Sequence, residues 1–140
     1  MKAAKAKSQD VKELAFTRAF SSFSVDDLDE AKKFYSQTLG LDVDKTKEGL
    51  DIEFEDGQNV FIYPKEDHEP ATFTVLNLLV DDIREAVDKL TGLGVTFEQY
   101  TGEMKTDENG IMWGKEHGGG PNIAWLKDPA GNFISVIEEP

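Results

Sequence analysis

The sequence has no cysteine, only two histidines and only two arginines among its 140 residues. The lack of cysteine excludes disulfides, a thiolate nucleophile and zinc–thiolate sites. Long apolar runs are lacking too: no window approaches the roughly 18 apolar residues of a membrane-spanning helix. No apolar segment follows the lysines of the first ten residues, MKAAKAKSQD. We therefore expect a cytoplasmic protein that does not enter a membrane.

Positive charge is scarce. Fifteen Lys and Arg stand against 28 Asp and Glu, which gives a formal net charge of −13. Such a balance repels phosphate backbones and anionic lipids, so we expect no nucleic-acid partner. The acidity has two interpretations that stay open: it keeps the protein soluble, or it draws a cationic ligand towards a cleft.

The chain contains an internal sequence repeat. FSVDDLDEAKKFYSQTLGL, residues 23–41, is matched by LLVDDIREAVDKLTGLGV, residues 78–95. Each copy is typical of the end of a strand followed by an amphipathic helix. At this length and with 39% hydrophobic residues, the two copies belong to one compact domain.

Both predicted helices have start and stop signals. Asp27 and Asp82 are N-cap candidates, each followed three residues later by a glutamate that completes a capping-box pattern. Gly40 and Gly94 stand where a helix would end in a left-handed residue.

Short alternating segments after each helix predict strands. Those of the first copy span residues 41–45, 50–55 and 59–63, and those of the second span 95–100, 122–127 and 133–138. The sequence therefore predicts an N-terminal arm (1–15) and a single domain (16–140) made of two βαβββ modules: module one (16–64), a linker (65–71) and module two (72–139).

Module two also carries an insertion, residues 101–121, which we interpret as a lid over a site. A strand is expected within it near 111–114. The HGGGP run at its end lacks the Lys-Ser/Thr of a phosphate-binding loop and is interpreted as a hinge.

The motifs VDDLDEAKKFY…LGL, VDDIREAV and DPAGNFISVIE, in this order, resemble the vicinal oxygen chelate superfamily over residues 16–139. That superfamily contains glyoxalase I, extradiol dioxygenases and the bleomycin and fosfomycin resistance proteins. The resemblance implies an α+β fold in which tandem βαβββ modules form a curled mixed sheet around a central cleft, with helices on the outer face. It also implies a homodimer, with the modules pairing either within one chain or between two.

In the metal-binding branches of that superfamily, four inward-facing His, Glu or Gln side chains hold a divalent cation. The resemblance places these positions at Phe20, Ile62, Val75 and Ser135. None is a normal ligand for such a cation, so we expect no metal and no cofactor.

Strand alternation separates a cleft face from a core face. The side chains assigned to a ligand-binding cleft are Phe20, Ser22, Ser24, Ile62, Val75, Asn77, Phe133 and Ser135. Trp113 of the insertion is expected to contact the ligand, whereas Trp125 is assigned to the core. A cleft of this composition suits a small molecule, although the same side chains could simply fill the space between the sheets.

The function that we predict is metal-free binding of a small organic molecule, a drug or a metabolite, aromatic or cationic in character. No GxSxG motif is present, and no serine has a histidine at a sequence position typical of a triad. Two alternatives remain: a glyoxalase- or dioxygenase-like lyase, isomerase or oxygenase, and a non-catalytic interaction module that uses residues 1–13 as a contact arm.

Overall fold

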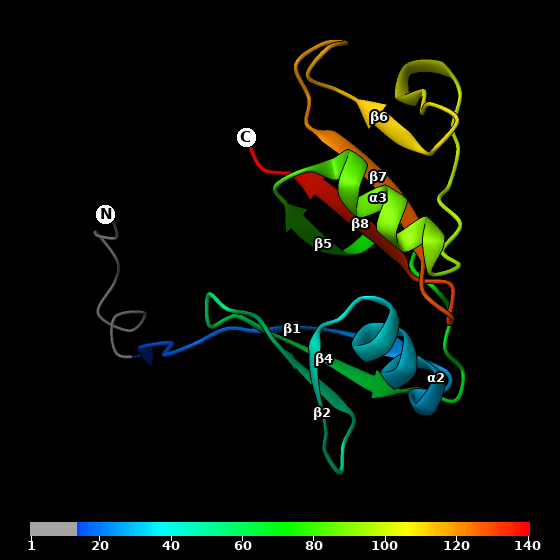
Figure 1. Cartoon of the computed structure of the whole chain (residues 1–140). Helices are drawn as coiled ribbons and strands as arrows, with labels where there is room; N and C mark the ends of the chain where they lie inside the picture. Colours follow the sequence, from blue (N-terminus) through cyan, green and yellow to red (C-terminus); the bar gives the residue numbers. More distant parts are fainter. Residues whose placement is uncertain (1–13) are drawn as a thin grey trace.

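The computed structural model describes residues 14–140, which form two βαβββ units in tandem (Figure 1). Residues 1–13, most of the predicted arm, lie outside the described residues. The elements of the first unit are β1 (Ser21–Val25), α2 (Leu28–Lys33), the π-helix η1 (Phe34–Thr38), β2 (Asp42–Lys45), β3 (Leu50–Glu53) and β4 (Asn59–Pro64). Those of the second are β5 (Thr74–Val80), α3 (Ile83–Gly92), the short 3₁₀ helix η2 (Gly102–Met104), β6 (Ile111–Trp113), β7 (Asn122–Lys127) and β8 (Phe133–Glu138).

The two units have the same strand topology. Their sheets have the orders β1-β4-β3-β2 and β5-β8-β7-β6. In each, the first strand runs parallel to its neighbour and the remaining pairs are antiparallel. The predicted α+β fold is therefore confirmed, with its strands in two four-stranded sheets. No helix in the described part of the chain has the length and apolar character needed to span a membrane.

Both helices begin at the predicted caps. The backbone N–H of Glu30 donates to Asp27 Oδ1 at 3.1 Å, and the N–H of Glu85 donates to Asp82 Oδ1 at the same distance. The carboxylate satisfies a donor that has no partner within the helix. Each helix is followed by a glycine with positive φ, Gly40 at 70° and Gly94 at 98°.

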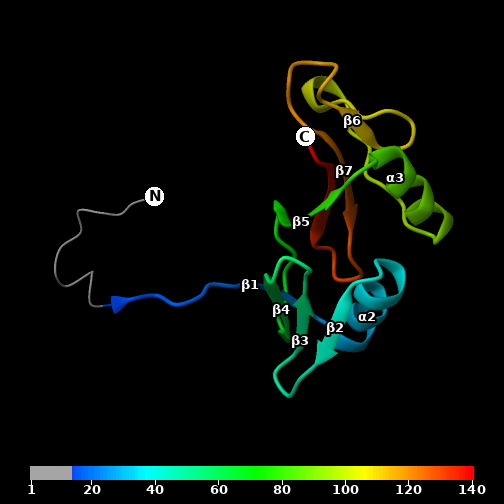
Figure 2. The ribbon, with the colours of Figure 1, turned by 60° about the vertical axis from the view of Figure 1, so that its left-hand side comes forward.

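The helices cover one face of the sheets. In Figures 1 and 2, α2 and α3 lie on the same side of the two sheets. The helix side carries the apolar core, and each large side chain buried there contributes about 1.5–3 kcal/mol. Fully buried members of this core are Val25, Ala31, Tyr35, Leu50, Ile52, Ile62, Ile83, Val87, Ile111, Ala124, Leu126, Ile134 and Val136.

One predicted strand is wrong. Residues 95–100 are irregular, and the backbone bond that joins them to β7 is the one in which Glu98 N–H donates to Trp125 O at 2.8 Å. The fourth strand of this sheet is instead β6, which lies within the insertion and pairs with Asn122–Ala124 of β7. Two segments therefore lie along the same edge of β7: residues 95–100 lie beside Trp125, and β6 of the insertion pairs with Asn122–Ala124.

The carboxylate of Glu138 joins the last strand to α3. Its Oε2 accepts from the Ile83 backbone N–H at 3.0 Å, and its Oε1 accepts from Asn122 Nδ2 at 3.0 Å and from Lys115 Nζ at 3.3 Å. The bond from Ile83, followed by those from Asn122 and Lys115, lowers the pKa of this carboxyl. The start of α3 is therefore held by both a local cap and β8.

A polar junction connects the two units at the turn between β7 and β8. The Tyr35 hydroxyl donates to Asp128 Oδ2 at 2.7 Å, and both groups are buried. Asn132 Nδ2 donates to Ser24 O at 2.9 Å. His68, in the linker, donates from Nε2 to the Ala130 carbonyl at 3.0 Å and accepts from the Ser24 hydroxyl at Nδ1 at 2.7 Å. These bonds fix how the two sheets are placed relative to each other.

Tyr35 should make the stability fall at alkaline pH. Burial, followed by the charge of Asp128 and the hydrogen bond to it, raises the pKa of Tyr35 far above its usual value. The phenol stays neutral in the folded state but ionises in the unfolded state above about pH 10. Its contribution is therefore complete below that pH and decreases by about 1.4 kcal/mol per pH unit above it.

The test compares wild type with Tyr35→Phe in urea titrations from pH 8 to 12. At pH 8 the variant should be less stable by about 1 kcal/mol, because Asp128 loses one donor. Above pH 10 the stability of the variant should decrease less steeply. Parallel pH profiles for the two proteins would contradict this assignment.

Candidate functional site

The sheet faces turned away from α2 and α3 form the candidate site. We call them the open face. On β1, Ser22 and Ser24 point to it, while Phe23 and Val25 are buried on the helix side, as predicted. On β5, Asn77 and the 61% exposed Leu79 point to it, and Leu76 is buried.

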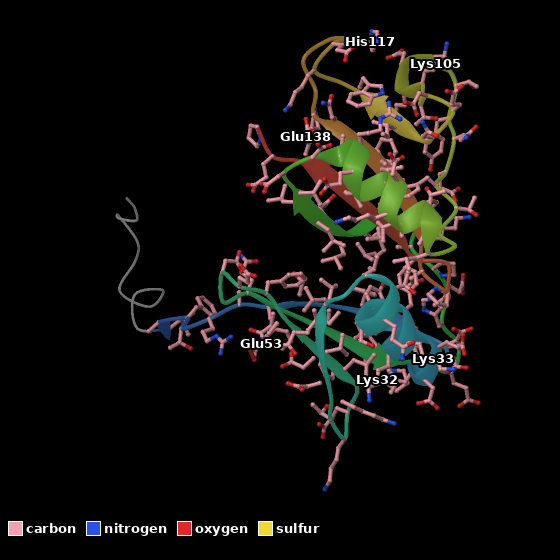
Figure 3. The ribbon with its side chains drawn as sticks, in the orientation of Figure 1. Lys32, Lys33, Glu53, Lys105, His117 and Glu138 are labelled. Carbon is pink, nitrogen blue, oxygen red and sulfur yellow. The ribbon has the colours of Figure 1, made fainter. Side chains whose placement is uncertain are left out.

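In the first unit the open face is acidic. Asp51 pairs with Asp44 on one side and with Phe61 on the other, and Glu53 pairs with Asp42. These four carboxylates alternate with buried Ile52 of β3 and therefore point away from the core. Glu53 is labelled in Figure 3.

In the second unit the open face is aromatic. A cavity of about 240 Å³ is lined by Thr72, Phe73, Thr74, Tyr100, Met104, Trp125 and Phe133. The rings of Tyr100 and Trp125 meet edge to face, with centroids 5.5 Å apart. Lys127 Nζ lies 5.2 Å from the Phe133 ring centroid, so a cation is already accommodated against this aromatic patch.

A larger cavity, of about 390 Å³, lies between η1 and the turn after α3. It is lined by Phe34, Thr38, Leu93, Gly94, Val95, Thr96, Glu98, Lys127, Asp128 and Pro129. None of the predicted cleft residues reaches it, and Phe34 is its one aromatic side chain. The smaller cavity is the stronger candidate site because it contains the predicted Phe133 and offers several aromatic faces.

Ser135 and Asn77 form a polar pair beside the aromatic patch. The Ser135 side chain is fully buried, and its hydroxyl donates to Asn77 Oδ1 at 2.5 Å. The two residues are register partners on β8 and β5, and Ser135 is also paired with Trp125 on β7. One row across three strands therefore contains an amide, a hydroxyl and an indole.

Ile62 does not belong to this face. It is fully buried and is the register partner of Phe23, so it points into the helix-side core, and its predicted orientation is wrong. Val25 pairs with Pro64, and its repeat counterpart Val80 pairs with Glu138. Pro64 and Glu138 are therefore equivalent positions in the two units. Ser135 lies three residues before Glu138 and Phe61 lies three residues before Pro64, so Phe61, and not Ile62, is the counterpart of Ser135.

The placement of the two tryptophans is the reverse of the prediction. Trp113 lies on the side that α3 covers: its Nε1 donates to Asp107 Oδ2 at 2.9 Å, and the Arg84 guanidinium carbon is 5.3 Å from its ring centroid. Trp125, assigned to the core, is half-buried in the aromatic patch.

Asp107 holds the insertion in this position. Partial burial acts to raise its pKa, but the bonds from Trp113, Ile111 and Asn109, together with the charge of Arg84, lower it. The carboxylate is thus anchored as a charged acceptor. Because of these bonds the middle of the predicted lid is part of the helix layer, and only its first residues, including Met104, reach the open face.

The remaining predicted residues lie along the first strands of the two units. Phe20 precedes β1 and is 67% exposed, and Val75 of β5 is half-buried. Ser24 takes part in the junction through His68. The sequence does not predict this Ser–His pair, because the two residues are 44 positions apart and meet only when the linker packs against β1.

The side chains at the superfamily's metal positions do not fit a divalent cation. In the structure these positions hold Phe20, Phe61, Val75 and Ser135. Three have no donor atom, and the hydroxyl of the fourth is buried against Asn77. Hard and borderline cations require carboxylate oxygen or imidazole nitrogen. Within residues 14–140, no group of three or more His, Asp or Glu is placed to hold a metal.

The second histidine is remote from the open face. Figure 3 shows His117, with Lys105, at the end of the second unit that lies farthest from the first. Its backbone N–H donates to Gly114 O at 3.1 Å, as part of the turn that follows β6.

Comparison with known proteins agrees with this architecture. The model of the Glyoxalase/Bleomycin resistance protein/Dioxygenase superfamily matches residues 18–136. A protein described as a probable lactoylglutathione lyase from Vibrio parahaemolyticus is 27% identical over 128 residues, which cover 81% of this chain and 84% of that protein.

Two solved structures share the fold at low identity. TnmS3, an antibiotic binding protein from a Streptomyces species, has a TM-score of 0.60 at 22% identity and covers 89% of this chain and 98% of its own. The fosfomycin resistance protein FosX from Listeria monocytogenes has a TM-score of 0.63 at 10% identity and covers 90% of this chain and 95% of its own.

Proposed function

Since the chain belongs to the glyoxalase/bleomycin resistance protein/dioxygenase superfamily, we propose that it binds a small aromatic cation noncovalently and without a metal ion. The observation that carries this proposal is the composition of the open face. One unit offers four carboxylates and the other an aromatic cavity of about 240 Å³. An aromatic cation would stack on the rings while its charge is attracted by the carboxylates.

In this proposal the acidic part and the aromatic part of the open face, called the acidic wall and the aromatic wall, come together in a homodimer. Because both helices lie on one side (Figure 2), the two parts of the open face point to the same side of the molecule. A second copy, related by a two-fold axis, would place its acidic wall over the aromatic wall of the first. Phe73 and Leu79 on this side are 68% and 61% exposed, which supports such a cover. Sedimentation should give twice the chain mass, also after deletion of residues 1–13.

The proposed ligand chemistry is tested with matched probes that differ in charge. The first is fluorene with a trimethylammoniomethyl group at C2, and the second is fluorene-2-carboxylate. We expect the cation to bind at least about tenfold more tightly, with the difference decreasing in high salt. Calorimetry gives both affinities, and EDTA should not change them. Tighter binding of the anion, or loss of binding in EDTA, would overturn the proposal.

A second candidate function is that of an enzyme, and the probable lactoylglutathione lyase at 27% identity is the observation in its favour. The side chains at Phe20, Phe61, Val75 and Ser135 argue against the metal-assisted version of that activity. Incubation with the hemithioacetal of methylglyoxal and glutathione, the compound that isomerises to lactoylglutathione, should give no turnover in the presence of nickel, zinc or manganese. Metal-dependent turnover would replace the binding function with the catalytic one.

A further inference from the structure

We propose that Asn77 selects ligands with a neutral hydrogen-bond acceptor, such as a ring ketone, next to their aromatic part. This inference rests on the proposed binding function and specifies the ligand class further. It follows from the bond between Ser135 and Asn77, which determines which atoms of the Asn77 amide point to the open face.

The Ser135 hydroxyl fixes the orientation of the amide. Ser135 is fully buried, and Asn77 is its side-chain partner in the described structure. If the amide were turned round, the hydroxyl would accept from Nδ2 and its own proton would have no acceptor in the interior. A buried donor without a partner is costly. The Asn77 oxygen therefore faces Ser135, and its NH₂ group remains available.

The available NH₂ group lies where a ligand on Trp125 would reach it. Asn77 is exposed, and Leu79, two residues further along the same face of β5, is apolar and exposed. Trp125 stands two strands away in the same row, a separation of about 10 Å at the usual strand spacing. A fused aromatic ring stacked on the indole can extend along this row and place a ketone oxygen at the amide.

The same geometry penalises ligands without an acceptor. Covering the Asn77 NH₂ group with a ligand removes water from its two N–H donors, and a hydrocarbon offers them nothing in return. For a site open on one side, this difference should amount to about tenfold in affinity. Selection is thus for an acceptor at one position and not for hydrophobicity alone.

The experiment uses two cationic probes that differ in one group. Both carry the trimethylammoniomethyl group on a fluorene ring; one has CH₂ at C9 and the other has the 9-ketone. Wild type should bind the ketone about tenfold more tightly. In Asn77→Asp the side chain only accepts, so the preference should disappear or reverse. Added charge affects both probes equally and cancels in the ratio.

The Ser135→Ala variant tests whether the preference for the ketone depends on the orientation of the Asn77 amide and not only on the presence of an asparagine. Without the hydroxyl the amide can turn, and the preference for the ketone should fall to about threefold, with similar affinity for the CH₂ probe. In ¹⁵N-labelled wild type, the ketone should shift the Asn77 side-chain NH₂ resonances more than the CH₂ probe does.

Two results would count against the inference in different ways. If both probes bind wild type equally, and both are weakened by Trp125→Ala, the selection by Asn77 is wrong and the proposed binding function stands. If neither probe binds, the proposed function fails, and the inference fails with it.

Discussion

Replacing Asp128 with alanine is expected to destabilise the fold by about 3 kcal/mol. This carboxylate is 4% exposed. It accepts from the Tyr35 hydroxyl, from the backbone N–H groups of Ala130 and Asn132, and from Asn132 Nδ2, at 2.7 to 3.0 Å. The substitution leaves the Tyr35 hydroxyl buried without a partner and removes the acceptor that closes the β7–β8 turn.

Urea denaturation followed by circular dichroism measures this loss. Asp88→Ala is the matched control, because Asp88 is an exposed residue of α3, and its removal should change stability by less than about 0.5 kcal/mol. A loss below about 1 kcal/mol in Asp128→Ala would show that the junction contributes little.

Removing the Trp125 side chain should weaken binding of the cationic fluorene probe by about 30-fold. The indole forms a wall of the cavity, and loss of a stacked aromatic face costs about 2 kcal/mol. The ring also supports Tyr100, whose edge packs against it with centroids 5.5 Å apart. The Trp125→Ala variant should therefore lose affinity and keep most of its stability, because Trp125 is only half-buried.

The other tryptophan supplies the control. Trp113→Phe changes a ring on the helix side and should leave the affinity within about twofold of wild type. Ligand-induced fluorescence changes should persist in Trp113→Phe, where Trp125 is the remaining indole, and should vanish in Trp125→Phe. Loss of the signal in Trp113→Phe with its retention in Trp125→Phe would contradict the location of the site.

Features that depend on neighbours in sequence could be predicted. The caps at Asp27 and Asp82, the glycines that end both helices, and the bounds of β7 and β8 all follow from local patterns. The internal repeat predicted two modules of the same kind, and the two sheets have equivalent strand orders. Membership of the superfamily was also correctly identified from three short motifs.

The wrong orientations predicted for side chains at the site have two causes: a strand register that was wrong by one residue, and contacts between residues far apart in the sequence. Matching Asn59 with Asn132 in the two copies makes Ile62 the counterpart of Ser135. However, Glu138 follows Asn132 by six residues, whereas Pro64 follows Asn59 by only five, so this match is one residue out of register and assigns Ile62 to the wrong face. For Trp125 a signal was present: it alternates with buried Ala124 and Leu126 and shares its face with Lys127. The side on which Trp113 lies depends on contacts with Arg84 and Asp107 that only the fold creates.

The junction also has a consequence for how the protein is made. Tyr35 and its acceptor Asp128 are 93 residues apart, and Asn132 reaches the carbonyl of Ser24 across 108 residues. While the chain grows on a ribosome, the first unit emerges with a phenol in its interior that has nothing to donate to. We therefore expect the first unit to gain its full stability only when the final hairpin, β7 and β8, has been synthesised.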